Sequence, residues 1–255
     1  MSLVQYSAEG AVALITLNRP PVNALNAELI GDLTDAASMA DDPAVRAVVM
    51  TGNRFFAAGA DIKRFIDAFD SGASEPQASR LGELIQRIER LPKPVIAAIN
   101  GYALGGGLEL AMGADFRYVA ESARVGQPEV LLGLIPGAGG TQRLQRIVGY
   151  QRAKDMVLTG RQVAADEALA IGLADKVVAD DDLLSVAMED AERWAAGPTA
   201  AYAAAKRSLS EARALPLDEA LAFEGARFNE LFGTSDAKAG VLAFVNKEQA
   251  EFKGS

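Results

Sequence analysis

The amino-acid sequence predicts an α/β fold in which a largely parallel sheet is covered by helices on both faces. Two observations support this prediction. In the first half of the chain, short apolar runs alternate with longer segments of helical periodicity, which is the pattern of repeated strand and helix units. After Tyr150 nearly every segment has the helical period, so a helical region is expected to follow the α/β core.

The alternation has four steps, and each apolar run predicts a strand. A helix is expected after the first three strands and a loop after the fourth. The expected pairs are Val12–Leu17 with Leu25–Ala40, Val45–Thr51 with Ile62–Phe69, and Val95–Ile99 with Leu108–Ala114, before a last strand at Phe116–Val119. Asn26 is the expected N-cap of the first helix, and Pro43 marks its end because proline cannot continue a helix.

Six helices are expected after Tyr150, separated by glycine and proline residues. They are Gln151–Leu158, Ala164–Ile171, Asp181–Ala195, Tyr202–Ala212, Leu217–Phe232 and Ser235–Glu251. We therefore expect an α/β core over residues 1–195 and a helical region over residues 196–255. Between Asp67 and Ser79 the chain is polar and rich in small residues, which predicts a surface segment, either a lid over a ligand or a plain loop.

The composition excludes several classes of function. The 255 residues include no cysteine and no histidine, so disulfides and the usual Ser-His-Asp and Cys-His arrangements are absent. A zinc site would need carboxylates alone, so no metal is expected. The formal net charge of −9 repels polyanions, and we therefore expect no nucleic-acid partner.

The longest apolar stretch, Pro94–Ala114, approaches the length of a membrane span. It contains Asn100, Glu109 and several glycines, so a buried strand, turn and helix are expected there and no membrane association. The first residues, Met1–Tyr6, place no basic segment before an apolar core. A secretion signal is therefore not expected, and the cytoplasm is the expected location.

Three segments rich in glycine and small residues follow predicted strands: Phe55–Asp61, Gly101–Gly107 and Pro136–Thr141. None has the spacing of a dinucleotide or P-loop motif. Gly105–Gly107 instead places backbone N–H groups at the start of a helix, where they attract negative charge. Ala58–Asp61 offers the same geometry, with Asp61 as a helix N-cap. Amides from these two loops could clamp one carbonyl oxygen, although tight turns alone also explain the glycines.

Two glutamates lie in apolar surroundings and are candidate proton-transfer groups. Glu109 follows Gly107 at the start of a largely apolar helix, and Glu129 stands twenty positions later among apolar residues. Burial raises the pKa of a carboxylic acid, and two neighbouring carboxylates push their pKa values apart, so that one serves as acid and the other as base. A charge that satisfies free amides at a helix N-terminus is the simpler alternative for each, and the spacing does not decide whether the two side chains meet.

These motifs, taken together, strongly resemble the enoyl-CoA hydratase/isomerase, or crotonase, superfamily. The resemblance spans almost the whole chain and is carried by Phe56–Lys63, Asn100–Ala111, Gly126–Glu129 and Pro136–Leu144, with Asn18–Pro20, Asn23–Asn26, Leu158–Gly160 and Gly172–Ala174 in support. It implies a crotonase-like spiral of ββα units with a C-terminal helical region that mediates trimer formation, usually as a dimer of trimers.

The resemblance also implies a set of site residues. The amides of Ala60 and Gly106 would form the oxyanion hole, Glu109 would activate water for attack at C3, and Glu129 would deliver the proton to C2. No cofactor is implied, because coenzyme A is part of the substrate. The implied contacts with coenzyme A are Ala24, Leu25, Ala58, Ala60, Asp61, Ile62, Lys63 and Gly106, joined by Phe244 and Lys247 of a neighbouring subunit.

Several alternatives remain open at this stage. A Δ3,Δ2-enoyl-CoA isomerase needs only one base, so the presence of Glu109 beside Glu129 favours hydration. A specialised dehydratase, decarboxylase or thioester hydrolase on the same scaffold would differ mainly in the acyl pocket. A non-catalytic acyl-CoA binder or an RNA-binding relative is a different class, which the two glutamates and the −9 charge disfavour.

Overall fold

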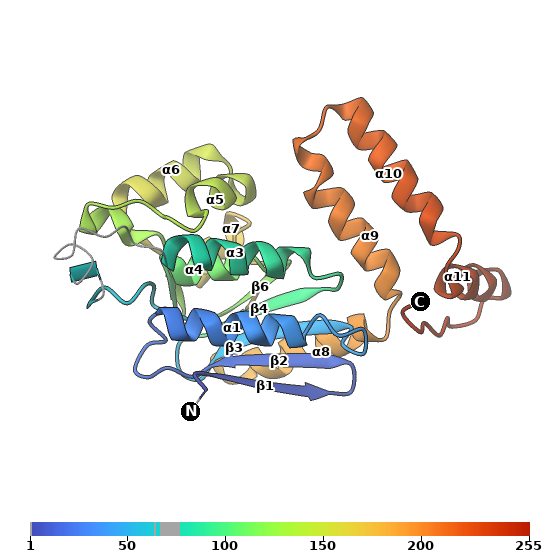
Figure 1. Ribbon diagram of the computed structural model, residues 1–255, viewed down its shortest axis with the longest axis horizontal. Helices are drawn as coiled ribbons and strands as arrows, with labels where there is room; N and C mark the ends of the chain where they lie inside the picture. Colours follow the sequence, from blue (N-terminus) through green and yellow to red (C-terminus); the bar gives the residue numbers. More distant parts are fainter. Residues whose placement is uncertain (1, 64, 67–76) are drawn as a thin grey trace.

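A computed structural model describes residues 2–63, 65, 66 and 77–255 of the protein. Its main sheet has the strand order β1-β2-β3-β4-β6-β9, and the neighbouring strands are parallel except for the β1–β2 pair (Figure 1). The strands are β1 Val4–Glu9, β2 Val12–Leu17, β3 Ala47–Gly52, β4 Val95–Ile99, β6 Phe116–Ala120 and β9 Lys176–Val178. Strands β3 and β4 are buried along their whole length, as expected of central parallel strands covered on both faces.

A second, smaller sheet lies beside the first and has the order β5-β7-β8, with β5 Tyr102–Leu104, β7 Arg124–Gly126 and β8 Gln162–Ala164. Two parallel bridges, Leu25 with Ala60 and Ala57 with Ala103, extend the same layer toward the N-terminus. The chain therefore passes repeatedly through a strand of the main sheet, a strand or bridge of the second layer, and then a helix. This repetition forms a spiral of ββα units, as the sequence predicted.

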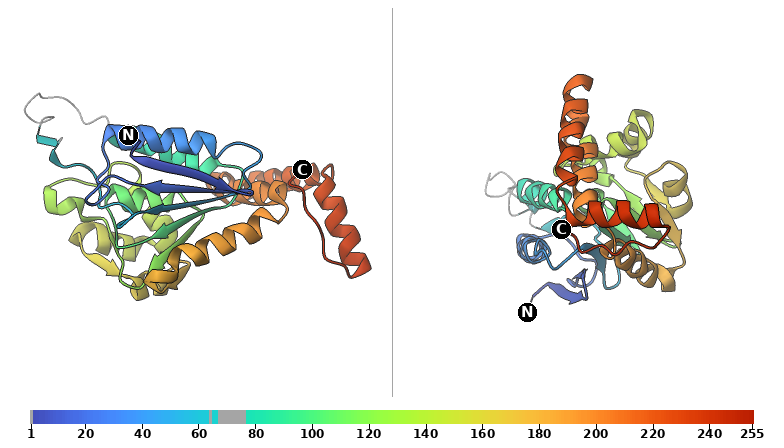
Figure 2. Two further views of the ribbon diagram at one scale, coloured as in Figure 1. Left: turned by 90° about the horizontal axis from the view of Figure 1, so that it is seen from below. Right: turned by 90° about the vertical axis from the view of Figure 1, so that its right-hand side faces the viewer.

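Helices cover both faces of the main sheet (Figures 1 and 2). Helices α1 (Ala27–Met39), α3 (Gln77–Arg90) and α4 (Gly106–Met112) lie on one side, and α8 (Leu183–Ala195) packs against β2, β3, β4 and β6 on the other. The expected N-cap is confirmed, because the side chain of Asn26 accepts a hydrogen bond from the N–H of Leu29 at 2.9 Å.

The remaining helices are α5 (Gly140–Val148), α6 (Tyr150–Thr159), α7 (Ala165–Ala170), α9 (Thr199–Ser210), α10 (Leu217–Leu231) and α11 (Ser235–Asn246), with short 3₁₀ turns at Pro128–Leu132 (η1), Asp180–Asp182 (η2) and Ala212–Ala214 (η3). Helices α9 to α11 project away from the sheets (Figures 1 and 2). A half-buried ion pair joins α9 to the core, with Lys206 Nζ 2.7 Å from Asp115 Oδ2. No helix in the described part of the chain is long and apolar enough to cross a membrane.

The predicted strands and helices were mostly confirmed, with boundaries that differ by at most three residues except at the end of the last helix. The exceptions are elements that the sequence did not predict: β1, the short strands β5, β7, β8 and β9, and the helices α3 and α5. Strand β1 is an edge strand with mostly exposed side chains, and the other missed strands have three residues each, too few to display a period of two.

The predicted surface segment and the last predicted helix both extend further along the chain than in the structure. The surface segment expected up to Ser79 ends sooner, because α3 begins at Gln77; the residues before it, 67–76, lie outside the described ones. The helix predicted over Ile62–Phe69 is described only in part, with helical conformation at residues 63, 65 and 66. The last helix ends at Asn246 and not at Glu251, because Lys247 takes a left-handed conformation (φ 58°) and caps it.

Candidate active site

Successive turns of the spiral place their functional residues at the same point, where the chain leaves the second layer and enters a helix. Leu25 precedes α1, Ala60 precedes the helical residues near 63, Gly105 precedes α4, and Glu129 follows β7. These exits surround one cavity of about 300 Å³. Its lining includes Leu25, Ala58, Ala60, Ile62, Gly106, Glu109 and Glu129, together with Leu81, Leu132, Leu134, Ile135 and Ala138.

Glu109 lies in the first turn of α4 and is 3% exposed. Its Oε1 atom accepts hydrogen bonds from the backbone N–H groups of Ala138 at 2.8 Å and Gly140 at 2.7 Å. Burial raises the pKa of Glu109 above its ordinary value, while the two N–H groups and the charge of Arg143 act in the opposite direction. Because the Ala138–Gly140 loop binds Oε1, the second oxygen, Oε2, is the one that can interact with a molecule in the cavity.

Glu129 lies in the first turn of η1 and is partly buried. Burial, and to a smaller extent the negative charge of Glu109, raise the pKa of Glu129 to about 7. Because two N–H groups and the charge of Arg143 favour the ionised form of Glu109, we assign the first ionisation of the pair to Glu109. Between the two ionisations the site therefore holds one carboxylate and one carboxylic acid, as acid and base catalysis requires.

The three consecutive glycines before Glu109 have different structural causes. Gly105 has φ 50°, and a Cβ there would stand 2.9 Å from Glu129 Oε1. At Gly106 a Cβ would meet the side chains of Leu81 and Leu25 at 3.1 and 3.2 Å, and at Gly107 it would clash with Ala57 O at 2.1 Å. Only glycine therefore lets α4 start so close to both carboxylates.

The backbone amides expected in the oxyanion hole are both available to the cavity. The Leu25–Ala60 bridge uses the carbonyl of Gly59 and the N–H of Asp61, so the N–H of Ala60 takes no part in it. Gly106 is the first residue of α4, where the N–H groups of a helix have no intrahelical acceptor. Both residues thus lie on the cavity wall that also holds Glu109.

Two residues next to the carboxylates, Gln127 and Arg143, lie within the sequence motifs but were not predicted to have a role. Gln127 is fully buried, and with its amide nitrogen turned toward Glu129 it donates hydrogen bonds to Oε1 and Oε2 at 2.9 and 3.1 Å. Arg143 donates to Ala138 O at 2.8 Å, next to the N–H that binds Glu109. The sequence could have indicated a role for Gln127, because it is a polar residue in a largely apolar segment. It could not have indicated the role of Arg143, because the contact with Ala138 forms only in the folded loop.

The residues expected to contact coenzyme A fall into three groups. Leu25, Ala58, Ala60, Ile62 and Gly106 line the cavity. Ala24 and Asp61 meet at Arg19, which donates to Ala24 O at 2.8 Å and to Asp61 Oδ2 at 2.6 Å; Lys63 is exposed nearby in the chain. Phe244 and Lys247 belong to the end of α11, far from α4 in the same chain (Figure 1).

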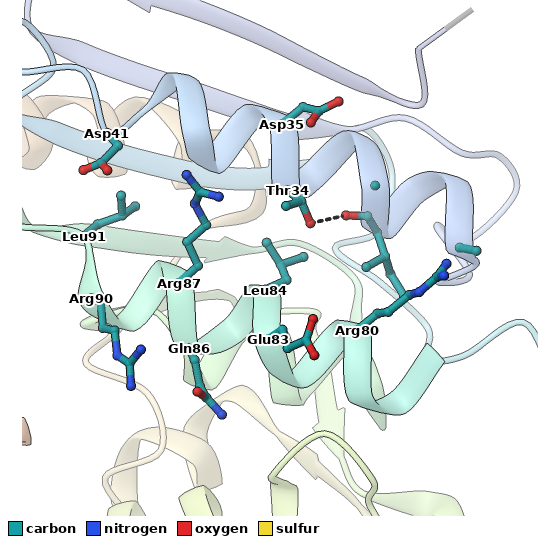
Figure 3. Close-up of a pocket in the computed structure, with 13 residues that line it drawn as sticks. Thr34, Asp35, Asp41, Arg80, Glu83, Leu84, Gln86, Arg87, Arg90 and Leu91 are labelled. Carbon is teal, nitrogen blue, oxygen red and sulfur yellow. Dashed lines mark hydrogen bonds between the residues drawn. The ribbon is translucent and has the colours of Figure 1, made fainter. Parts of the chain in front are cut away.

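Asp61 pairs with Arg19, and the helix that it was expected to cap lies mostly outside the described residues. A second hollow, of about 750 Å³, lies between α1 and α3 (Figure 3). Its arginines, Arg80, Arg87 and Arg90, are balanced by acidic side chains, and neither Glu109 nor Glu129 lines it. Among the described residues, no group of three or more acidic side chains could hold a metal ion.

The enoyl-CoA hydratase/isomerase family model matches residues 7–255. The chain belongs to this family. Among similar members, a probable enoyl-CoA hydratase of Rhizobium meliloti is 47% identical over 253 residues, covering 96% of this chain and 95% of that protein. The short-chain-enoyl-CoA hydratase of Clostridium acetobutylicum is 42% identical, covering 95% and 94% of the two chains.

Solved structures of family members have the same fold. An enoyl-CoA hydratase of Geobacillus kaustophilus matches with a TM-score of 0.94 and 32% identity, covering 100% of this chain and 98% of that one. An enoyl-CoA hydratase/isomerase family structure from Mycobacterium abscessus also gives 0.94, at 34% identity and 99% and 100% coverage. The α/β crotonase-like fold expected from the sequence is thereby confirmed.

Proposed function

We propose that the protein is an enoyl-CoA hydratase, a hydro-lyase that reversibly adds water across the 2,3-double bond of 2-enoyl-CoA thioesters. The observation that carries the proposal is the meeting of Glu109 and Glu129 in one cavity with the amides of Ala60 and Gly106. Relatives with 42% identity over about 95% of the chain are a short-chain-enoyl-CoA hydratase and a crotonyl-CoA hydratase, which supports the same reaction.

The proposed mechanism gives each group one task. The N–H groups of Ala60 and Gly106 bind the thioester oxygen and stabilise the negative charge that develops there. Glu109, as carboxylate, accepts a proton from water while the water oxygen bonds to C3. Glu129, as carboxylic acid, then donates its proton to C2, and proton exchange with solvent restores both groups.

The direct test is hydration of crotonyl-CoA by the wild-type protein and by the Glu109→Gln and Glu129→Gln variants. We expect the wild-type protein to hydrate crotonyl-CoA. Both variants should still bind the thioester, but their hydration rate should be lower by several orders of magnitude. A 3-enoyl-CoA substrate serves as the isomerase control. Efficient conversion of that substrate together with full activity of Glu109→Gln would favour the one-base isomerase and overturn the hydratase proposal.

The proposal extends to substrate contacts and assembly. Ala24, Leu25, Ala58, Ala60, Asp61, Ile62, Lys63 and Gly106 would contact the thioester and coenzyme A, with Phe244 and Lys247 reaching the site of a neighbouring subunit. A homotrimer or a dimer of trimers is supported by α10 and α11, which expose large apolar side chains such as Phe228 (60%) and Phe244 (86%). Residues 196–255 would form the trimerisation region beside a core of residues 1–195.

The remaining parts of the proposal concern the cellular setting. The reaction needs no cofactor apart from the coenzyme A carried by the substrate, and acid and base catalysis by Glu109 and Glu129 needs no metal. A cytoplasmic role in fatty-acid metabolism of the β-oxidation type fits an enzyme that hydrates enoyl thioesters. Fractionation of cells and growth on fatty acids after gene deletion would test both points.

A further inference from the structure

An arginine on α5 connects helix α3 to the loop that holds Glu109. Arg143 forms a two-pronged ion pair with Glu89 of α3, with Nε 2.6 Å from Oε1 and Nη2 2.8 Å from Oε2. The third guanidinium nitrogen, Nη1, donates to the carbonyl of Ala138 at 2.8 Å. The Arg143 side chain is only 16% exposed, and a bidentate pair of this kind fixes both the position and the plane of the guanidinium.

Arg143 holds the same short turn whose N–H groups bind Glu109. Ala138 accepts from Arg143 through its carbonyl and donates through its own N–H to Glu109 Oε1. Gly140, two residues on, supplies the second N–H to the same oxygen. Between them Gly139 has φ 105°, and a Cβ there would stand 2.0 Å from Arg143 Nη1, so the loop is shaped around the guanidinium.

Helix α3 supports the same loop at its other end. A Cβ on Gly137 would stand 3.1 Å from Ala78 Cβ, and a Cβ on Gly82 would reach the Cα of Ala138 at 4.0 Å. The loop is therefore pressed against the first turns of α3 and tied to its last turn through Glu89 and Arg143. Glu89 and Arg143 themselves line a cleft beside α9 and act on the catalytic cavity from outside it.

We propose that Arg143, anchored by Glu89, is a positioning residue that holds the Ala138–Gly140 turn so that both N–H groups meet Glu109 Oε1 and Oε2 faces the reacting water. This inference rests on the proposed role of Glu109 as the base. The positive charge of Arg143 also lowers the pKa of Glu109, against the effect of burial, and so favours the carboxylate form.

We call the contacts of Arg143 with Glu89 and with the Ala138 carbonyl the Arg143 clamp. The test compares three variants that change this clamp in different ways. Arg143→Gln removes both the positive charge and the bidentate guanidinium contact. Arg143→Lys keeps the charge but loses the bidentate contact, and Glu89→Gln keeps Arg143 but removes the carboxylate that pairs with it. Arg146→Gln is the matched control, because Arg146 lies on the same helix, is exposed, and donates only to Gln142 of its own helix. Each variant is first checked for wild-type circular dichroism.

For crotonyl-CoA hydration we expect Arg143→Gln to lower kcat on the order of 10- to 100-fold, with a smaller change in KM, because the thioester contacts stay in place. The acid limb of its pH profile should move to higher pH, since Glu109 loses a favourable charge. Arg143→Lys should lower kcat but leave the acid limb near that of wild type, and Glu89→Gln should lower kcat less. Arg146→Gln should change neither quantity.

A second measurement separates this inference from the proposed reaction. Titration of Glu109 by carboxyl-carbon NMR, with the resonance assigned by its loss in Glu109→Gln, needs no substrate. We expect a higher Glu109 pKa in Arg143→Gln than in wild type and no change in Arg146→Gln. An unchanged Glu109 titration in a folded Arg143→Gln protein, or equal kcat values for all variants, overturns the proposed role of Arg143.

If Arg143→Gln does not fold, the same measurements on the Arg143→Lys and Glu89→Gln variants decide the question. A wild-type protein without hydratase activity overturns the proposed function, and the NMR titration still tests the clamp.

Discussion

The carboxylate of Glu129 lies against the backbone of Gly105, so closely that a Cβ on Gly105 would stand 2.9 Å from Oε1. The two residues come from adjoining turns of the spiral and meet because Gly105 donates its N–H to Gly126 O at 2.9 Å. The proposed proton donor is thus positioned by the residue that also starts the helix of the proposed base.

Substitution of Gly105 should therefore damage catalysis and folding together. We expect Gly105→Ala to lower crotonyl-CoA hydration by at least about 10-fold, because the methyl group displaces Glu129 from its place in the cavity. Gly133→Ala is the control, since Gly133 also has a positive φ, 72°, but a Cβ there meets nothing within 4 Å. The control should show only the strain of a left-handed alanine, about 1 kcal/mol, in denaturant unfolding with near-normal turnover. Equal turnover of the two variants would contradict the assigned contact.

The pH dependence of hydration should report the acid of the pair. Hydration needs Glu129 protonated, and its pKa is raised to about 7, so kcat/KM should fall as the pH rises through this value. Glu109 must be ionised, and we assign it a lower pKa than Glu129. The acid limb of the pH profile of kcat/KM should therefore report the ionisation of Glu109. Initial rates with crotonyl-CoA across neutral pH measure both limbs. A rate that stays constant from well below to well above pH 7 would contradict the assignment of Glu129 as acid.

The same shift predicts a link between Glu129 and stability. In the folded protein Glu129 keeps its proton up to about pH 7, whereas the unfolded chain releases it near the ordinary value of 4.5. The unfolding free energy of the wild type should therefore fall as pH rises from about 4.5 to 7, by up to about 3 kcal/mol from this group. Glu129→Gln lacks this loss, so its stability relative to wild type should be greater at pH 8 than at pH 5. Parallel denaturant midpoints at the two pH values would argue against the raised pKa.

The sequence predicted the central strands and the first helix, because their apolar periods are long and their capping residues are local. It also placed Glu109 and Glu129 among apolar residues, but their meeting depends on pairing between β5 and β7, three-residue strands that show no readable period. The role of Arg143 was beyond prediction for a related reason: Glu89 lies 54 residues away along the chain, and only the packing of α3 against the loop before α5 brings them together.

Arg46, the residue before β3, helps to join the core to the C-terminal helices. Arg46 donates to Thr199 Oγ1 at 2.9 Å, to Phe252 O at 3.2 Å and to Gly197 O at 2.5 Å, so it joins the turn before α9 to the segment after α11. These helices carry the exposed apolar side chains of the proposed trimerisation region. Loss of Arg46 should therefore leave the helices less fixed in orientation and weaken assembly.

We expect Arg46→Ala to lower the mass measured by light scattering at low protein concentration, and to shift the denaturant midpoint downward. Arg124→Ala is the matched control, because within the described part of the chain the Arg124 side chain donates only to the carbonyls of Ser122 and Ala123 beside it. If Arg46→Ala keeps the wild-type mass at every concentration while Arg124→Ala does the same, the orientation of α9 to α11 does not depend on Arg46.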